Sequence, residues 1–215
     1  MNHELNDQEL FRRQSLATMR EMGIDPYPAA EYVVNAHVDE VKANFNDEEK
    51  REVSMAGRLM SRRIMGKASF AELKDSTGRI QLYISRDEIC PDENKDLYNT
   101  VFKKLLDIGD FIGVKGYVFR TQTGEISIHV SELTVLSKAL RPLPIVKTDK
   151  DGNIHDAFED PELRFRQRYV DLVVNEGVKD IFVKRNKVYT SMREYFNSNG
   201  YMEVETPVLQ SIPGG

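Results

Sequence analysis

The sequence has few of the residues that bind transition metals or form covalent cross-links. Its 215 residues include one cysteine, Cys90, four histidines and no tryptophan. A single cysteine cannot form an internal disulfide, and the four scattered histidines do not give the Cys/His spacing of a zinc site. The composition therefore argues against a disulfide framework or a zinc module, and it favours a reducing, cytoplasmic setting.

Long apolar stretches are also absent. No segment approaches the roughly 18 apolar residues that a membrane-spanning helix needs. Residues 1–4 lack the basic and apolar regions of a secretory signal, so we expect no membrane partner. Hydrophobic residues make up 40% of the chain and charged residues 30%, as is typical of globular domains. At about 150 residues per domain, the length fits one or two of them.

Charge is distributed unevenly along the chain, whose formal net charge is -5. Residues 1–50 carry 11 acidic and 5 basic side chains, whereas residues 56–86 carry 7 basic and 2 acidic ones. An acidic chain with one basic stretch is compatible with nucleic acid contacting one face. A solvated charged surface would give the same pattern, so charge alone leaves both interpretations open.

The first fifty residues are predicted to form a helical extension. Near-helical spacing relates four apolar residues, Leu10, Leu16, Met19 and Met22. Gly23 ends this run, because glycine commonly follows the last turn of a helix. A second amphipathic stretch places Val38, Val41 and Phe45 on one side.

From residue 52 to residue 137 the hydrophobic period changes to two, which predicts strands. Five strands are expected, over 53–64, 69–74, 79–84, 112–118 and 125–130. Between the third and fourth strands, residues 94–108 have helical spacing. Three strands, a helix and two strands is the order of a five-stranded Greek-key OB barrel, whereas an SH3-like barrel does not normally carry that helix.

The remaining residues are predicted to begin a second domain. Helices are expected over 161–174, with Asp160 as the N-cap, and over 178–197, followed by a short strand over 201–207. Two helices and one strand cannot close a domain. The expected boundaries are a helical extension at 1–50, an OB domain at 51–138, a linker at 139–160 and the incomplete start of an α+β domain at 161–215.

Outward-facing side chains of the predicted barrel suggest a binding surface. Ala71 and Leu73 would face inward, so Phe70 would face outward. The other expected members are Gln81 on the next strand, Glu125 and His129 on the last strand, and Arg62 and Arg63 at the end of the first. Single-stranded nucleic acid needs this combination of stacking, hydrogen-bonding and guanidinium groups. Alternatively, Phe70 packs under the N-terminal helices and Gln81 is an ordinary surface residue.

Longer strings carry a resemblance to a known family. MSRRIMGKASF at 60–70 and TQTGEIS at 121–127 resemble the OB domain of bacterial-type class II lysyl-tRNA synthetases. LRFRQRYVDL at 163–172 resembles the start of their catalytic domain, and GYMEVETP at 200–207 is similar to class II motif 1. The resemblance covers nearly the whole chain and implies an N-terminal fragment that ends just after motif 1.

This resemblance implies roles for the residues already identified. The OB domain would bind the anticodon of tRNA-Lys, with Phe70 stacking on the central uridine while Arg63, Gln81 and Glu125 read or position it. Arg62 and His129 complete the expected anticodon-binding set, and the Gly214 backbone would help to hold the lysine substrate. Helix 178–197 and the motif 1 strand would form a homodimer interface.

The full-length protein would be a lysine-tRNA ligase that uses ATP and Mg²⁺, with their sites beyond residue 215. The resemblance thus implies no catalytic or metal-binding residue in this chain and no ligase activity of the chain alone. Two alternatives remain: a stand-alone OB module for single-stranded nucleic acid, and the N-terminal part of an aspartyl- or asparaginyl-tRNA synthetase. Residues 161–215 count against the first. The 62–70 string and the helical N-terminus count against the second.

Overall fold

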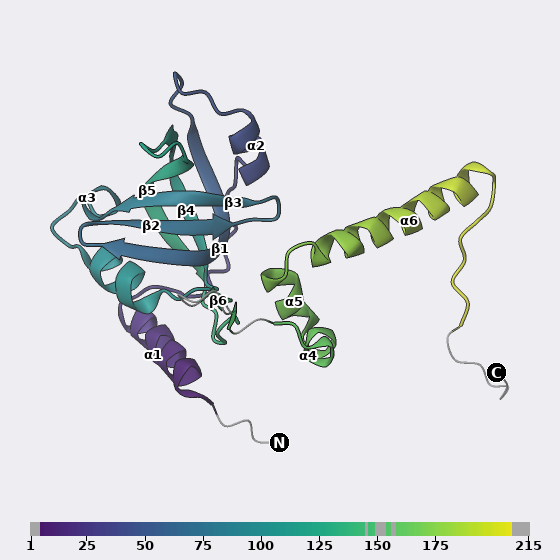
Figure 1. Ribbon diagram of the computed structural model, residues 1–215, viewed down its shortest axis with the longest axis horizontal. Coiled ribbons are helices and arrows are strands. Elements are labelled where there is room, and N and C mark those ends of the chain that lie inside the picture. Colours follow the sequence, from purple (N-terminus) through teal and green to yellow (C-terminus); the bar gives the residue numbers. More distant parts are fainter. Residues whose placement is uncertain (1–4, 145, 149–153, 156–157, 208–215) are drawn as a thin grey trace. The chain divides into compact units, whose positions relative to one another are not determined.

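The structure is a computed structural model that describes residues 5–144, 146–148, 154–155 and 158–207 (Figure 1). The chain divides into two compact units, Met1–Leu143 and Pro144–Gly215. Each unit is described by itself below.

A closed five-stranded barrel forms the centre of the first unit. Its strands are β1 (Glu52–Met65), β2 (Ala68–Lys74), β3 (Arg79–Ser85), β4 (Phe111–Arg120) and β5 (Ile126–Ser137). They are hydrogen-bonded in the order β1-β2-β3-β5-β4, and the barrel closes because β1 also pairs with β4. All neighbours are antiparallel except β3 and β5. The predicted OB fold is confirmed.

Alternation of buried and partly exposed residues, strict in β2 and β3, builds the barrel core. In β2 and β3 every second residue is buried and the others are partly exposed. Leu59, Leu73, Leu82, Ile112 and Ile128 have no exposed surface. Burying such a side chain contributes about 1.5–3 kcal/mol, so the inward row fixes which residues face outward.

Two close approaches between strands require glycine. A Cβ atom at Gly116 of β4 would lie 2.0 Å from the carbonyl oxygen of His129 on β5. At Gly57 of β1 it would lie 2.6 Å from the carbonyl oxygen of Lys74. Backbone oxygens in a ladder cannot move aside cheaply, so neither site accepts a side chain.

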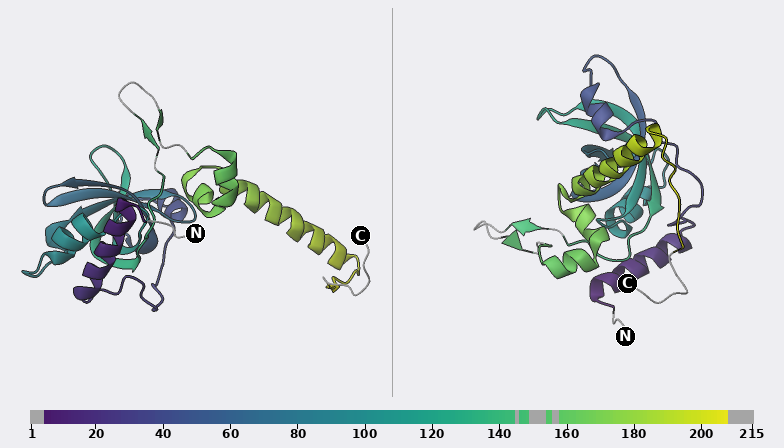
Figure 2. Two further views of the ribbon diagram at one scale, coloured as in Figure 1. Left: turned by 90° about the horizontal axis from the view of Figure 1, so that it is seen from below. Right: turned by 90° about the vertical axis from the view of Figure 1, so that its right-hand side faces the viewer.

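Within residues 5–143, four helical segments accompany the barrel, namely α1 (Asp7–Glu21), α2 (Val38–Ala43), α3 (Arg86–Ile89) and η1 (Leu97–Leu105). The segment η1 is the helix predicted between the third and fourth strands. It is a π-helix rather than an α-helix, and the N–H of Leu106 donates to the carbonyl of Val101, five residues earlier. Helix α1 packs against η1 (Figure 2). Asn6 and Glu9 cap α1 reciprocally.

The buried face of α1 differs from the predicted one. Of the four apolar residues expected to face the core, only Met19 is buried, and Leu10 is exposed. The helix instead buries Glu9, Arg12 and Ser15. Arg12 accounts for this rotation, because its guanidinium donates to the carbonyls of Ala139 (2.9 Å) and Ile108 (3.0 Å). The buried face of α1 therefore carries a hydrogen-bonded guanidinium rather than the predicted apolar row.

In its described residues, the second unit contains a two-stranded ribbon and three helices. These are β6 (Lys147–Thr148), β7 (Ile154–His155), α4 (Pro161–Arg166), α5 (Arg168–Val174) and α6 (Val178–Ser198). As predicted, Asp160 caps α4 by accepting a hydrogen bond from the N–H of Leu163. The helix expected over 161–174 is divided at Gln167. The buried Asp171 carboxylate follows this break and accepts hydrogen bonds from Arg164 and Arg168.

The strand predicted over residues 201–207 is not formed. These residues have no strand partner in the described part of the chain, and a strand needs a neighbour to satisfy its backbone groups. Among the described residues, no helix is both long and apolar enough to cross a membrane.

Candidate nucleic-acid interface

A cleft of about 810 Å³ lies on the outer wall of the barrel. Its floor consists of outward-facing residues of β2 and β3, and the loop between β4 and β5 forms one side. Four of the six predicted binding residues line it: Arg63, Phe70, Gln81 and Glu125. The volume is in the range of small-molecule and nucleotide pockets, about 300–1,000 Å³.

Phe70 supplies the aromatic surface of this cleft. It lies opposite Tyr83 in the register of β2 and β3, and the two ring centroids are 5.4 Å apart at an interplanar angle of 58°. Tyr83 also contacts the ring of Phe119 at 6.2 Å. The contact with Tyr83 leaves the Phe70 ring partly exposed in the cleft, where a planar base can stack.

Gln81 supplies a hydrogen-bonding group beside Phe70. The Ser127 hydroxyl donates to the Gln81 Oε1 atom at 2.8 Å. The amide –NH₂ of Gln81 is therefore the part that can donate to a ligand.

Charges of both signs line the cleft. Arg79 forms an ion pair with Glu72 at 3.1 Å, and Lys42 of α2 lies 3.7 Å from the Glu125 carboxylate. Arg63 is exposed at the end of β1. Three cations and two carboxylates give the cleft a modest positive excess, which suits a phosphate-bearing ligand.

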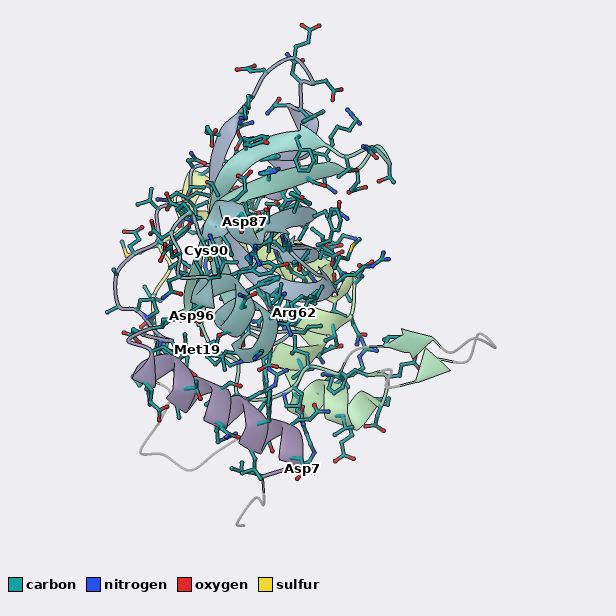
Figure 3. The ribbon with its side chains drawn as sticks, turned by 90° about the vertical axis from the view of Figure 1, so that its left-hand side faces the viewer. Asp7, Met19, Arg62, Asp87, Cys90 and Asp96 are labelled. Carbon is teal, nitrogen blue, oxygen red and sulfur yellow. The ribbon has the colours of Figure 1, made fainter. Side chains whose placement is uncertain are left out.

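Arg62 does not join this set, although it precedes Arg63. A β-bulge between Leu59 and Ser61 shifts the register, so that Arg63 pairs with outward-facing Phe70 and Arg62 with inward-facing Ala71. The Arg62 guanidinium donates to the carbonyls of Phe102 and Leu106 at the end of η1. Figure 3 shows Arg62 on the side of the barrel that carries α1. Burial lowers its pKa. Arg62 therefore stabilises the contact between β1 and η1 and does not line the cleft.

His129 lies next to the cleft rather than in it. Its ring stacks on Tyr117, with centroids 4.8 Å apart and an interplanar angle of 9°, and it contacts Tyr83 and Phe119. The Lys50 ammonium covers the Tyr117 ring at 3.8 Å. Neighbouring side chains thus cover these rings, and His129 packs against Tyr83.

Arg58, a residue of the basic stretch 56–86, is also engaged by other groups of the barrel. Its guanidinium donates to the Gly109 carbonyl at 2.7 Å and lies over the Phe111 ring at 4.3 Å. Lys42 and the loop residues 121–123 line the cleft without having been predicted. The charge of Lys42 was visible in the sequence, but nothing there indicated that α2 approaches this face.

Two further expectations concern the substrate and cofactors. Gly214 lies outside the described residues. In the part of the chain that the structure describes, no group of three or more His, Cys, Asp or Glu side chains is placed to hold a metal ion.

Comparison with known proteins identifies the class first. Residues 53–136 match the family of OB-fold nucleic acid binding domains that includes tRNA anticodon-binding domains, and residues 160–215 match class II tRNA synthetases (D, K and N). A barrel of this kind followed by the start of a class II domain defines an aminoacyl-tRNA synthetase chain.

Comparison over nearly the whole chain then gives specific relatives. The chain is 68% identical over 215 residues to the lysine–tRNA ligase of Porphyromonas gingivalis W83, covering 99% of this chain and 37% of that protein. It is 67% identical over 212 residues to the enzyme of Azobacteroides pseudotrichonymphae (98% and 42%), and 59% over 212 residues to that of Christiangramia forsetii (99% and 37%). The chain is thus homologous to lysine–tRNA ligases over nearly its whole length, and it spans 37–42% of the length of these relatives.

Proposed function

We propose that this chain is the anticodon-binding part of a lysine–tRNA ligase and that the cleft on β2 and β3 holds the central anticodon base of tRNA-Lys. The observation that carries the proposal is the convergence of Phe70, Gln81, Arg63 and Glu125 on one cleft of an OB barrel. These four are proposed as base-contacting residues. Arg62 and His129 are proposed to support them through η1 and Tyr83.

The chemistry of the cleft favours uridine. Uracil presents a carbonyl acceptor and an N–H donor along its pairing edge, whereas cytosine presents an amino donor and a ring-nitrogen acceptor. The Gln81 –NH₂ can donate to a carbonyl, and the Glu125 carboxylate can accept from an N–H. Phe70 stacks on the ring, a contact that contributes about 1–3 kcal/mol per base. The guanidinium of Arg63 can bind a carbonyl or a neighbouring phosphate.

For the whole protein we propose ATP-dependent activation of lysine and its transfer to tRNA-Lys in the cytoplasm. ATP and Mg²⁺ are proposed to bind in parts of the enzyme other than the described residues, and Gly214 is proposed to help hold the lysine. The proposed domains are a helical extension at 1–50, the anticodon-binding domain at 51–138, a linker at 139–160 and the start of the catalytic domain at 161–215.

We also propose that the whole enzyme is a homodimer that uses α6. What supports this is the apolar surface of a helix with only one buried residue, Val178. The exposed side chains include Ile181, Val188, Met192, Tyr195 and Phe196. A contiguous apolar surface of this kind marks a protein interface.

Fluorescence anisotropy with anticodon stem-loops tests the proposed function. The full 215-residue chain is titrated with the tRNA-Lys stem-loop and with the same loop carrying a central cytidine, at several salt concentrations. We expect tighter binding of the uridine loop at every salt concentration, because phosphate contacts are common to both loops. Equal, salt-sensitive binding to both loops would leave only a general single-strand binder and would refute the proposed function.

A further inference from the structure

We propose that Ser127 is a positioning residue that determines which end of the Gln81 amide faces the bound base. In this way it sets the choice between uridine and cytidine. The inference rests on the proposed function and adds a specificity determinant to it. Ser127 itself does not line the cleft, so its effect on the base has to pass through Gln81.

The position of Ser127 is unusual for a serine on the outward row of a strand. It has no exposed surface, although the row to which it belongs faces away from the barrel core. The parallel register of β3 and β5 places it directly beside Gln81, and the antiparallel register of β4 and β5 places it beside Phe119. Ser127 is therefore a buried polar group below the cleft.

The hydroxyl of Ser127 has one strong partner. Its distance to the Gln81 Oε1 atom is 2.8 Å, whereas its distance to the Glu125 carbonyl oxygen is 3.3 Å. Gln81 Oε1 is the nearer of the two acceptors, so the single hydroxyl proton is directed to it. The same hydroxyl lies beside the backbone of Glu125, the second group proposed to contact the base.

An amide side chain has two chemically opposite ends. Its oxygen accepts hydrogen bonds and its –NH₂ donates them, and rotation by about 180° exchanges the two. While Ser127 holds the oxygen, the –NH₂ is left for the ligand and matches the carbonyl of uracil. Without the hydroxyl, the amide can turn over and present its oxygen to the amino group of cytosine. The hydroxyl thus converts an ambiguous side chain into a donor.

The test compares Ser127→Ala with Ser131→Ala in the full chain. Ser131 is also on β5, but its hydroxyl donates to the Lys115 carbonyl at 3.2 Å, away from the cleft. Anisotropy gives the ratio of dissociation constants for the cytidine and uridine loops. We expect Ser127→Ala to lower this ratio about tenfold, through weaker binding of uridine and stronger binding of cytidine. Ser131→Ala should leave the ratio unchanged. A structural defect alone would weaken both loops equally, and an unchanged ratio in folded Ser127→Ala would overturn the proposal.

A second pair of variants tests the route through Gln81. In a Gln81→Ala background, Ser127→Ala should have no further effect on the ratio, and a full additional effect would refute positioning through the amide. Ser127→Cys keeps a similar shape with a weaker donor, so it should lower the ratio by less than Ser127→Ala. If thermal unfolding shows that Ser127→Ala does not fold, Ser127→Cys takes its place in the test. If the wild-type chain itself shows no uridine preference, the proposed function fails first. That result is distinct from a wild-type preference that Ser127→Ala leaves intact.

Discussion

The ammonium of Lys138 lies 2.9 Å from the carboxylate of Asp110, and neither side chain has any exposed surface. Asp107 binds the same ammonium. Asp110 also accepts hydrogen bonds from the N–H groups of Asp107 and Ala139, each at 2.7 Å. The charged pair lies where the chain leaves β5, and Tyr27 donates to the Lys138 carbonyl there. It therefore fixes both the N-terminal segment and the exit from the barrel.

Replacing Lys138 should be costly. In Lys138→Met the Asp110 carboxylate would be buried without its counter-charge, so we expect a loss of about 3–5 kcal/mol in the free energy of unfolding. Lys115→Met is the matched control, because Lys115 pairs with Glu132 at 2.7 Å but both side chains are exposed. That loss should be about 0–1 kcal/mol. Urea unfolding at pH 7 measures both, and equal losses would contradict the prediction.

Asp75 should make the barrel sensitive to acid. Burial alone would raise its pKa, but backbone hydrogen bonds from Val38, Thr77 and Gly78, together with the Thr77 hydroxyl, lower the pKa below its usual value. The unfolded-state value is about 3.9. The ionised carboxylate therefore contributes stability that is fully present above that pH and is lost as pH falls through the folded-state pKa.

Asp75→Asn is the corresponding variant. At pH 7 we expect it to be about 1–3 kcal/mol less stable than the wild type, because some of these backbone donors lose their acceptor. The difference should shrink as the pH falls below about 4. The control is Asp92→Asn at an exposed position, which should change stability by about 0.5 kcal/mol or less. Thermal unfolding over a pH series measures both, and a gap between wild type and Asp75→Asn that stays constant with pH would refute the assignment.

Arg62 and Arg63 form a natural pair for separating stability from binding. Arg62→Gln removes a guanidinium from the Phe102 and Leu106 carbonyls, so the free energy of unfolding should fall by about 1–3 kcal/mol. Arg63→Gln should leave stability within about 0.5 kcal/mol of the wild type but weaken binding of the anticodon stem-loop. Urea unfolding and anisotropy measure the two effects. If Arg62→Gln weakened only binding and Arg63→Gln lowered only stability, Arg62 rather than Arg63 would face the cleft, against the register of β1 and β2.

Phe70→Ala should remove the stacking surface. We expect stem-loop binding to weaken by about 1–3 kcal/mol, because base–aromatic stacking has that magnitude. Phe70→Tyr keeps the ring and should retain most of the affinity. Full affinity in Phe70→Ala, in a protein with unchanged thermal unfolding, would mean that the base does not stack there.

Alternation of apolar and polar residues predicted the barrel well because closure buries one face of every strand. Phe70 and Gln81 follow this alternation and were assigned to the correct face. Arg62 and Arg63 could not be distinguished in this way, because one extra residue near Met60 reverses the inward and outward sets of β1 beyond it. No residue type in that stretch indicates a bulge.

Hydrophobic spacing was a poorer guide to the helices. Helix α1 buries Arg12 because the carbonyls of Ile108 and Ala139 meet it there, and these residues are distant in sequence. The approach of Lys42 to Glu125 is likewise set by tertiary packing of α2. Residues 201–207 have a strand-like composition, but strand formation requires a partner. Contacts between distant segments decide the arrangement of α1 and α2, whereas the described residues give 201–207 no such contact.

The parallel pairing of β3 with β5 also has a consequence for cooperativity. Gln81 lies on one of these strands, and Ser127, with Glu125 just before it, belongs to the other. An open barrel would separate Gln81 from Ser127 and Glu125, so the cleft exists only once the hydrogen bonds between β3 and β5 have formed. A ligand that contacts both sides of the ladder binds the closed form alone and must shift the unfolding equilibrium toward it by mass action. Amide exchange along β3 and β5 would record that shift as slower opening, even though the proposed base contacts are made by side chains.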